Sequence, residues 1–170
     1  MHTLGINIGS SNVKVTMIEG DAILWNVVEP HEGNFSRALK NILSSRTLPR
    51  NIKSLATGTE GRHLLNVHSV IEPLCVEEAL RHIRHRVSAV VSLGGEDLVV
   101  YTINENSSII ANYSGSKCAS GTGEFFKQQL ARMDMTLDGV RSLPEDCRVL
   151  KLASRCSVFM KSDCTHRLNK

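Results

Sequence analysis

The sequence predicts an α/β protein built from two related lobes, each opening with three strands and a helix. Two stretches support this, because GINIGSSNVK (5–14) and SLGGEDLVVY (92–101) each place a tight turn of small residues between apolar strands. A further observation is that the order of expected elements restarts near residue 87. We therefore expect a first lobe in residues 1–86 and a second lobe in residues 87–170.

The first lobe is expected to contain strands at 4–8, 13–18, 23–28 and 52–56, and helices at 34–43 and 76–84. The first helix is favoured because apolar residues recur at helical spacing after Asn34 and Ser36, either of which can cap it. The turn Gly9–Asn12 joins the first two strands, and Gly20-Asp21 precedes the third.

The second lobe is expected to contain strands at 87–93, 98–103 and 109–113, a helix at 121–133, a short strand at 155–159 and the start of a helix at 161–169. The pattern stops there. We therefore expect the second lobe to be incomplete and the chain to be a fragment.

Composition excludes several functional classes. The 170 residues carry a net charge of +3, and aromatic residues make up only 4%, so a nucleic-acid surface is not indicated. No stretch approaches the roughly 18 apolar residues of a membrane span. Polar and glycine residues interrupt the apolar run in residues 1–20, so we do not expect a signal peptide there. The five cysteines are an odd number without a Cys-x-x-Cys pair. We therefore expect a cytoplasmic protein with reduced thiols and no membrane or nucleic-acid partner.

Each glycine turn is either an ordinary hairpin turn or a phosphate-binding loop. Small side chains leave the backbone N–H groups free to approach an anion. The candidate residues of the first turn are Gly9, Ser10, Ser11, Asn12 and Lys14. Those of the second are Gly94, Gly95, Glu96 and Asp97, whose two acids suit a Mg²⁺-linked water.

A cysteine-containing loop precedes the helix expected at 121–133. Gly121 and Gly123 let backbone amides approach a ligand, and a thiolate at a helix N-terminus is stabilised, which suits a reactive or metal-ligating Cys118. Cys156 has a similar context beside Arg155. The alternative is that each is a small buried hydrophobic residue.

Four motifs follow one another along the chain: GINIGSSNVK, SLGGEDLVVY, SGSKCASGTGEFF and SRCSVFMKSDCTHRLNK. In this order they resemble the ATPase family of activators for 2-hydroxyacyl-CoA dehydratases and benzoyl-CoA reductases. In particular, the chain resembles the N-terminal unit of the long CoA-substrate-specific enzyme activases. The resemblance implies an actin-like, sugar-kinase-like (ribonuclease H-like) ATPase fold with two lobes closing on ATP or ADP with Mg²⁺. It also implies an oxygen-sensitive homodimer with a 4Fe-4S cluster shared between two subunits. ATP hydrolysis would then drive a low-potential electron to a CoA-ester dehydratase or reductase.

By position, the resemblance makes Cys118 and Cys156 the cluster ligands, and the two glycine turns the phosphate loops, with Asp97 and Asn7 at the catalytic positions. The family usually has Asp at the position of Asn7. At the position of Glu96 the family usually has a residue with an amide side chain. The resemblance also implies that the family's adenine-binding segment would lie beyond residue 170. We therefore expect residues 1–170 alone to hydrolyse ATP very slowly or not at all.

Two other functions remain open at this point. A small-molecule kinase of the same fold, such as an amino-sugar kinase, would share the phosphate loops but need no cysteine pair, so iron content separates it from an activator. A non-catalytic nucleotide- or partner-binding module is the other alternative. Mg²⁺-dependent ATP hydrolysis by the longer protein would exclude it.

Overall fold

The protein is described by a computed structural model, which covers residues 1–83, 85–115, 123–153 and 156–169. The chain divides into two compact units. Unit 1 consists of Met1–Ala89 and Thr102–Ala111, and unit 2 of Val90–Tyr101 and Asn112–Lys170. The lobe limits expected at 86 and 87 stay a prediction.

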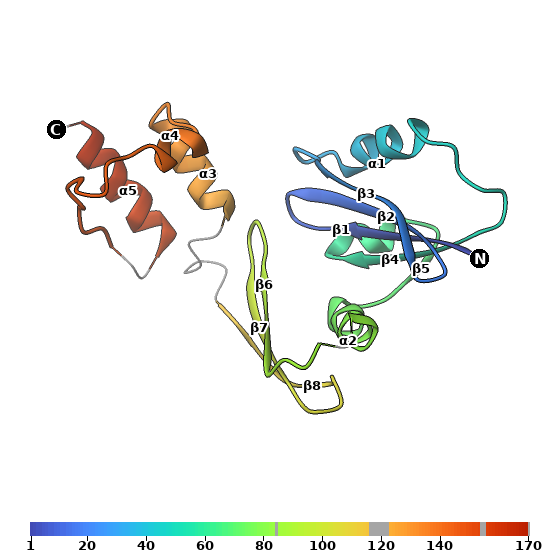
Figure 1. The fold of residues 1–170 in the computed structure, drawn as a ribbon. Coiled ribbons are helices and arrows are strands. Elements are labelled where there is room, and N and C mark those ends of the chain that lie inside the picture. The colour runs from blue at the N-terminus through green and yellow to red at the C-terminus, as the bar shows by residue number, and fades with distance from the viewer. Residues whose placement is uncertain (84, 116–122, 154–155, 170) are drawn as a thin grey trace. The chain divides into compact units, whose positions relative to one another are not determined.

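Unit 1 is built on a five-stranded sheet of order β3-β2-β1-β4-β5 (Figure 1). Its strands are β1 His2–Ile8, β2 Asn12–Glu19, β3 Ala22–Pro30, β4 Ile52–Gly58 and β5 His68–Ser69. Its helices are α1 Phe35–Ser44, the 3-10 helix η1 Glu60–Leu64 and α2 Glu72–Ile83. Strand β1 is antiparallel to β2 and parallel to β4, so the central strand is paired on both edges.

The core of unit 1 lies between α1 and one face of this sheet. Alternate residues of β1 and β2 pack against the buried face of α1. The strand residues are Leu4, Ile6, Ile8, Val13, Val15 and Met17, and the helix residues are Ala38, Leu39 and Ile42. Asn34 caps α1, because its side chain accepts a hydrogen bond from the Arg37 backbone N–H at 3.0 Å. Side chains alternate along a strand. The polar Asn7 and Lys14 therefore lie on the opposite face from α1.

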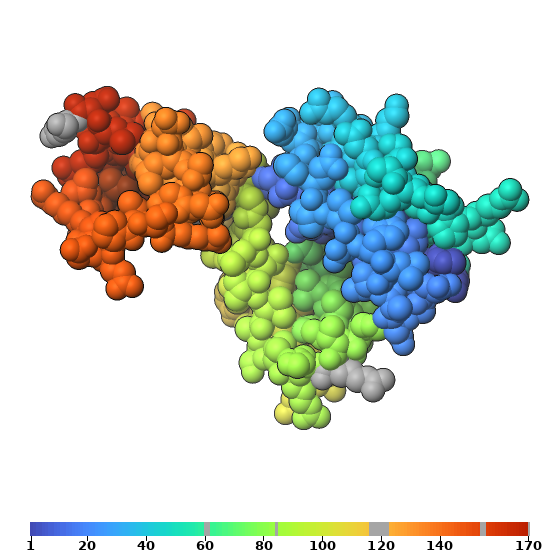
Figure 2. All heavy atoms as spheres, turned by 45° about the horizontal axis from the view of Figure 1, so that its top comes forward, coloured from blue at the N-terminus to red at the C-terminus, as the bar shows by residue number. Residues whose placement is uncertain are grey.

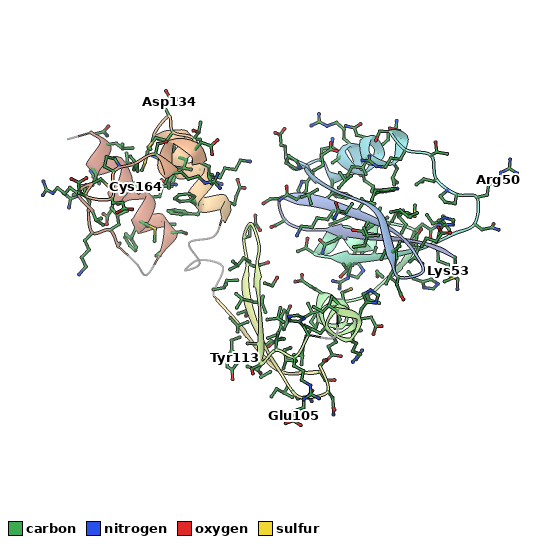
Figure 3. All side chains as sticks on the ribbon, viewed as in Figure 1. Arg50, Lys53, Glu105, Tyr113, Asp134 and Cys164 are labelled. Atoms are coloured by element: carbon green, nitrogen blue, oxygen red, sulfur yellow. The ribbon has the colours of Figure 1, made fainter. Side chains whose placement is uncertain are left out.

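The rest of the described chain contains a three-stranded sheet of order β6-β7-β8 and three helices. The elements are β6 Ala89–Leu93, β7 Leu98–Ile103, β8 Ile109–Ser114, α3 Gly123–Arg132, α4 Leu137–Arg141 and α5 Ser157–Leu168. In unit 2, Arg132 of α3 donates a 2.6 Å hydrogen bond to the Thr165 hydroxyl of α5. Cys164 of α5 is buried in this helical part (Figure 3).

The main expected strands and helices are confirmed, with differences at the ends. Helix α2 begins four residues earlier than predicted, because Pro73 is tolerated in a first helical turn. The predicted strand at 155–159 is wrong, since Ser157 already begins α5. Val158 and Phe159 are 69% and 67% exposed, so that apolar run is not a buried strand.

The surface of unit 2 includes a long exposed stretch. Residues 141–150, orange in Figure 2, are all exposed, and Val149 retains 89% of its accessible surface. None of the helices in the described parts of the chain has the length and apolar character that a bilayer span requires.

Candidate phosphate-binding site

The Gly9–Asn12 turn is closed tightly between β1 and β2. The Gly9 backbone N–H donates to the Asn12 carbonyl at 3.0 Å, and the His31 N–H donates to the Ser11 carbonyl at 3.1 Å. A Cβ atom added to Gly9 would lie 3.4 Å from the Asn12 carbonyl oxygen and 3.7 Å from Asn7 Oδ1. The Asn7 amide therefore lies beside the turn that follows it.

His31 ties this turn to the loop between β3 and α1. Its Nε2 lies 3.1 Å from the Gly9 carbonyl oxygen, and its Nδ1 accepts the Gly33 N–H at 3.0 Å. Because the Gly33 amide can only donate, the neutral ring carries its proton on Nε2, which donates to Gly9. His31 is only 9% exposed. Sequence reasoning missed this residue, because nothing in its local pattern signals a partner 22 residues away.

Lys14, Asn7 and Thr57 form a row across β2, β1 and β4. Asn7 is the register partner of both Lys14 and Thr57. All three line a cavity of about 280 Å³, whose other lining residues are Gly5, Ile6, Thr16, Leu55, Ala56 and Cys75. The lining thus contains one cation and no carboxylate, which favours an anionic occupant.

The end of β4 is bound to the end of β1. Thr59 donates to the Ile8 carbonyl through its backbone N–H at 2.9 Å and its hydroxyl at 3.2 Å. Gly58 has φ +106°, and a Cβ atom there would overlap the backbone of Ile8. Arg62 donates to the Gly58 carbonyl at 2.8 Å. Only glycine therefore fits where the two strands approach each other.

The second glycine turn, in unit 2, is closed by the same kind of hydrogen bond as the first. The Gly94 N–H donates to the Asp97 carbonyl at 2.7 Å, and a Cβ on Gly94 would lie 3.1 Å from that oxygen. The Glu124 N–H in the first turn of α3 donates to the Gly95 carbonyl at 2.8 Å. The turn is therefore attached to the N-terminus of α3, where Gly123 is the first residue.

Cys156 is the N-cap residue of α5, with extended backbone (φ −146°, ψ 129°) and a half-buried side chain. Its carbonyl accepts the Met160 N–H at 3.0 Å, which starts the helix. Cys118 and Gly121 lie outside the described residues. Within the described residues, no three His, Cys, Asp or Glu side chains gather as a metal site would require. The pairing of Cys118 with Cys156 stays a prediction.

The structure thus brings together Asn7, the Gly9–Asn12 turn and Lys14 in unit 1. In unit 2 it brings together the Gly94–Asp97 turn and the start of α3. That both turns bind one phosphate group, and that Glu96 and Asp97 act on Mg²⁺, stay predictions.

Comparison with known proteins first shows the fold class and then finds similar sequences. The chain superposes on the activator of 2-hydroxyisocaproyl-CoA dehydratase from Clostridium difficile with bound ADPNP, with a TM-score of 0.82, 22% identity and coverage of 99% of this chain and 66% of that one. The chain also superposes on component A of Acidaminococcus fermentans (R)-2-hydroxyglutaryl-CoA dehydratase, with a TM-score of 0.80 and 23% identity. That superposition covers 99% of this chain and 68% of component A. The fold is the actin-like ATPase fold.

Dehydratase activators are among the proteins with similar sequences. The chain is 26% identical to an uncharacterized protein of Methanocaldococcus jannaschii, with coverage of 98% of this chain and 70% of that protein. It is 25% identical to the activator of lactoyl-CoA dehydratase from Anaerotignum propionicum, with coverage of 99% and 68%. No family model matches the chain. The chain is similar in sequence to these dehydratase activators and spans about two thirds of their length.

Proposed function

We propose that this chain is the nucleotide-binding part of an ATP-dependent activator of a CoA-ester dehydratase or reductase. The observation that carries the proposal is the pair of glycine turns closed by the same hydrogen bond, Gly9 to Asn12 and Gly94 to Asp97. Two equivalent turns suit the two lobes of an actin-like ATPase. The ADPNP bound to the Clostridium difficile activator supports a nucleotide as the ligand.

In this proposal the two turns bind the phosphates of ATP or ADP with Mg²⁺. Backbone amides of the two turns other than those of Gly9 and Gly94, which close the turns, supply hydrogen bonds, and Lys14 supplies a positive charge. Asp97 orients a Mg²⁺-bound water. The related activators usually have an Asp at the position of Asn7. The Asn7 amide has no charge with which to orient Mg²⁺, so hydrolysis by this chain is slow.

The activator proposal also includes a 4Fe-4S cluster between two copies of the chain. Cys118 and Cys156 of each copy would supply the four thiolates, and such a cluster transfers single electrons at low potential. The position of Cys156 supports this assignment, because a helix N-terminus stabilises negative charge. The partner would be a CoA-ester dehydratase or reductase, and the named relatives are activators of CoA-ester dehydratases.

Two measurements test the proposal. Calorimetric titration with ADPNP and Mg²⁺ should give saturable binding to the chain, and failure to bind would exclude a nucleotide site. Anaerobic reconstitution with iron and sulfide should give about two irons per chain together with dimerisation, as one cubane per dimer requires. Nucleotide binding without any iron uptake would instead favour a kinase or a non-catalytic module of the same fold.

A further inference from the structure

The Thr57 side chain has a buried hydroxyl without a hydrogen-bond partner among the described residues. Buried polar groups are nearly always hydrogen-bonded, because leaving one unpaired costs free energy. The Thr57 hydroxyl is one of only two such atoms found in the described parts of the chain. An unpaired hydroxyl that lines a cavity is therefore suited to a ligand.

The surroundings of Thr57 indicate the chemistry of that ligand. Neighbouring strands lie about 4.8 Å apart, so the register partners Thr57, Asn7 and Lys14 place a hydroxyl, an amide and an ammonium in a row roughly 10 Å long. The cavity that they line has no carboxylate. A hydroxyl donor, an amide donor and a cation are together complementary to phosphate oxygens.

The position of Thr57 is fixed by the contacts that follow it. Gly58 passes too close to Ile8 for any side chain, and Thr59 donates twice to the Ile8 carbonyl. Thr57 is therefore held beside the end of β1, the strand that leads into the Gly9–Asn12 turn. A group held by backbone contacts loses little entropy when it binds.

We propose that the Thr57 hydroxyl is a phosphate ligand in unit 1, donating a hydrogen bond to an oxygen of the bound phosphate chain. This inference rests on the proposed function, because it takes the nucleotide as the source of the phosphate. It adds the end of β4 to the two glycine turns as a third contributor to the site.

The test compares Thr57→Val, which removes the hydroxyl and keeps the branched shape, with Thr57→Ser, which keeps the hydroxyl. Calorimetry with ADPNP and Mg²⁺ should show about tenfold weaker binding to Thr57→Val, because a hydrogen bond to a charged group is lost. Thr57→Ser should bind within about threefold of the wild type. Thr3→Val, on the same face of β1 but outside the cavity, is the matched control and should bind like the wild type.

Thermal unfolding without ligand separates a ligand role from a structural one. Thr57→Val should unfold at the same or a higher temperature than the wild type, because an unpaired buried hydroxyl is removed. A lower unfolding temperature would mean that the hydroxyl stabilises the fold, and would overturn the assignment. In a titration with tripolyphosphate and Mg²⁺, Thr57→Val should show the same loss of affinity as with ADPNP. If Thr57→Val binds ADPNP more weakly but binds tripolyphosphate as the wild type does, the proposed contact with phosphate is overturned.

The possible failures are distinguishable. If the wild-type chain binds neither ADPNP nor tripolyphosphate, the proposed function falls and the Thr57 assignment falls with it. If the wild type binds and Thr57→Val binds equally well, the nucleotide site stands and the Thr57 assignment is overturned.

Discussion

At the scale of single residues, the first glycine turn depends on a side chain from outside the hairpin. His31 donates to the Gly9 carbonyl through Nε2 and accepts from Gly33 through Nδ1, so one ring joins the turn to the loop before α1. The buried imidazole of His31 therefore stabilises the conformation of the proposed phosphate loop through these two hydrogen bonds. The backbone amides of the turn are then held in place before a ligand arrives.

We expect His31→Ala to lower the free energy of unfolding by about 1–3 kcal/mol, because it leaves the Gly9 carbonyl and the Gly33 amide without their partner. Denaturant unfolding measures this change. ADPNP affinity should fall as well, since the turn loses its support. His68→Ala, on the exposed edge strand β5, should change either quantity little. Equal stability of His31→Ala and the wild type would contradict the bridging role.

The amide at position 7 gives a second prediction at this scale. In Asn7→Asp the new carboxylate would face the phosphates with no Mg²⁺ between them when EDTA is present, so ADPNP affinity measured in EDTA should fall on the order of tenfold. With Mg²⁺ present the carboxylate can orient the ion and its waters, and phosphate release from ATP should rise. Asn41→Asp, on the exposed surface of α1, is the control. Unchanged binding and hydrolysis in Asn7→Asp would remove Asn7 from the site.

The sequence predicts those residues of the candidate phosphate site that belong to a local pattern, and it does not predict those brought there by non-local contacts. The Gly9–Asn12 turn and Lys14 are found because small turn residues between alternating strands are a local signal. Thr57 and His31 are not found, because only the parallel pairing of β1 with β4 and the path of the β3–α1 loop bring them to the turn. Those contacts are non-local and leave no pattern in a single sequence.

At the scale of elements, the junction of β1 and β4 depends on Gly58. Its φ of +106° is unfavourable for other residues, and the Ile8 backbone fills the space where a Cβ would lie. We expect Gly58→Ala to lower the free energy of unfolding by roughly 2–5 kcal/mol, from backbone strain and overpacking together. Gly20 in the β2–β3 turn has φ +59°, but no atom lies within 4 Å of the position that a Cβ would take there. Gly20→Ala should therefore cost only about 1–2 kcal/mol, and equal costs would contradict the close approach.

The elements themselves are predictable to different degrees. Strands β1, β2 and β3 and helix α1 follow from alternation, turn residues and the Asn34 cap. Helix α4 has only five residues and β5 only two, too few to show a period. The start of α5 at Ser157 is predicted wrongly as a strand, because a short apolar run fits either element.

At the scale of the whole molecule, the proposed cluster-bearing activator predicts a protein that works as a dimer. Two cysteines per chain cannot hold a four-iron cubane, whereas two copies about a twofold axis can. Cys156 is the N-cap residue of α5, and Cys118 comes before α3 in the sequence. Both helix N-termini would favour the negative charge of a thiolate-bound cluster.

The decisive variants are Cys118→Ala and Cys156→Ala, with Cys147→Ala as the control because Cys147 is an exposed cysteine without a helix start after it. After anaerobic reconstitution, each of the first two should lose the cluster absorbance and the iron, because the dimer would then supply too few thiolates to complete the cubane. Cys147→Ala should retain about two irons per chain and the dimer. Iron content by chelation and mass by light scattering are read on the same sample, so that loss of the cluster is separated from unfolding. If Cys118→Ala and Cys156→Ala keep the iron, the cluster ligands lie elsewhere, and the electron-transfer proposal for these residues must be abandoned.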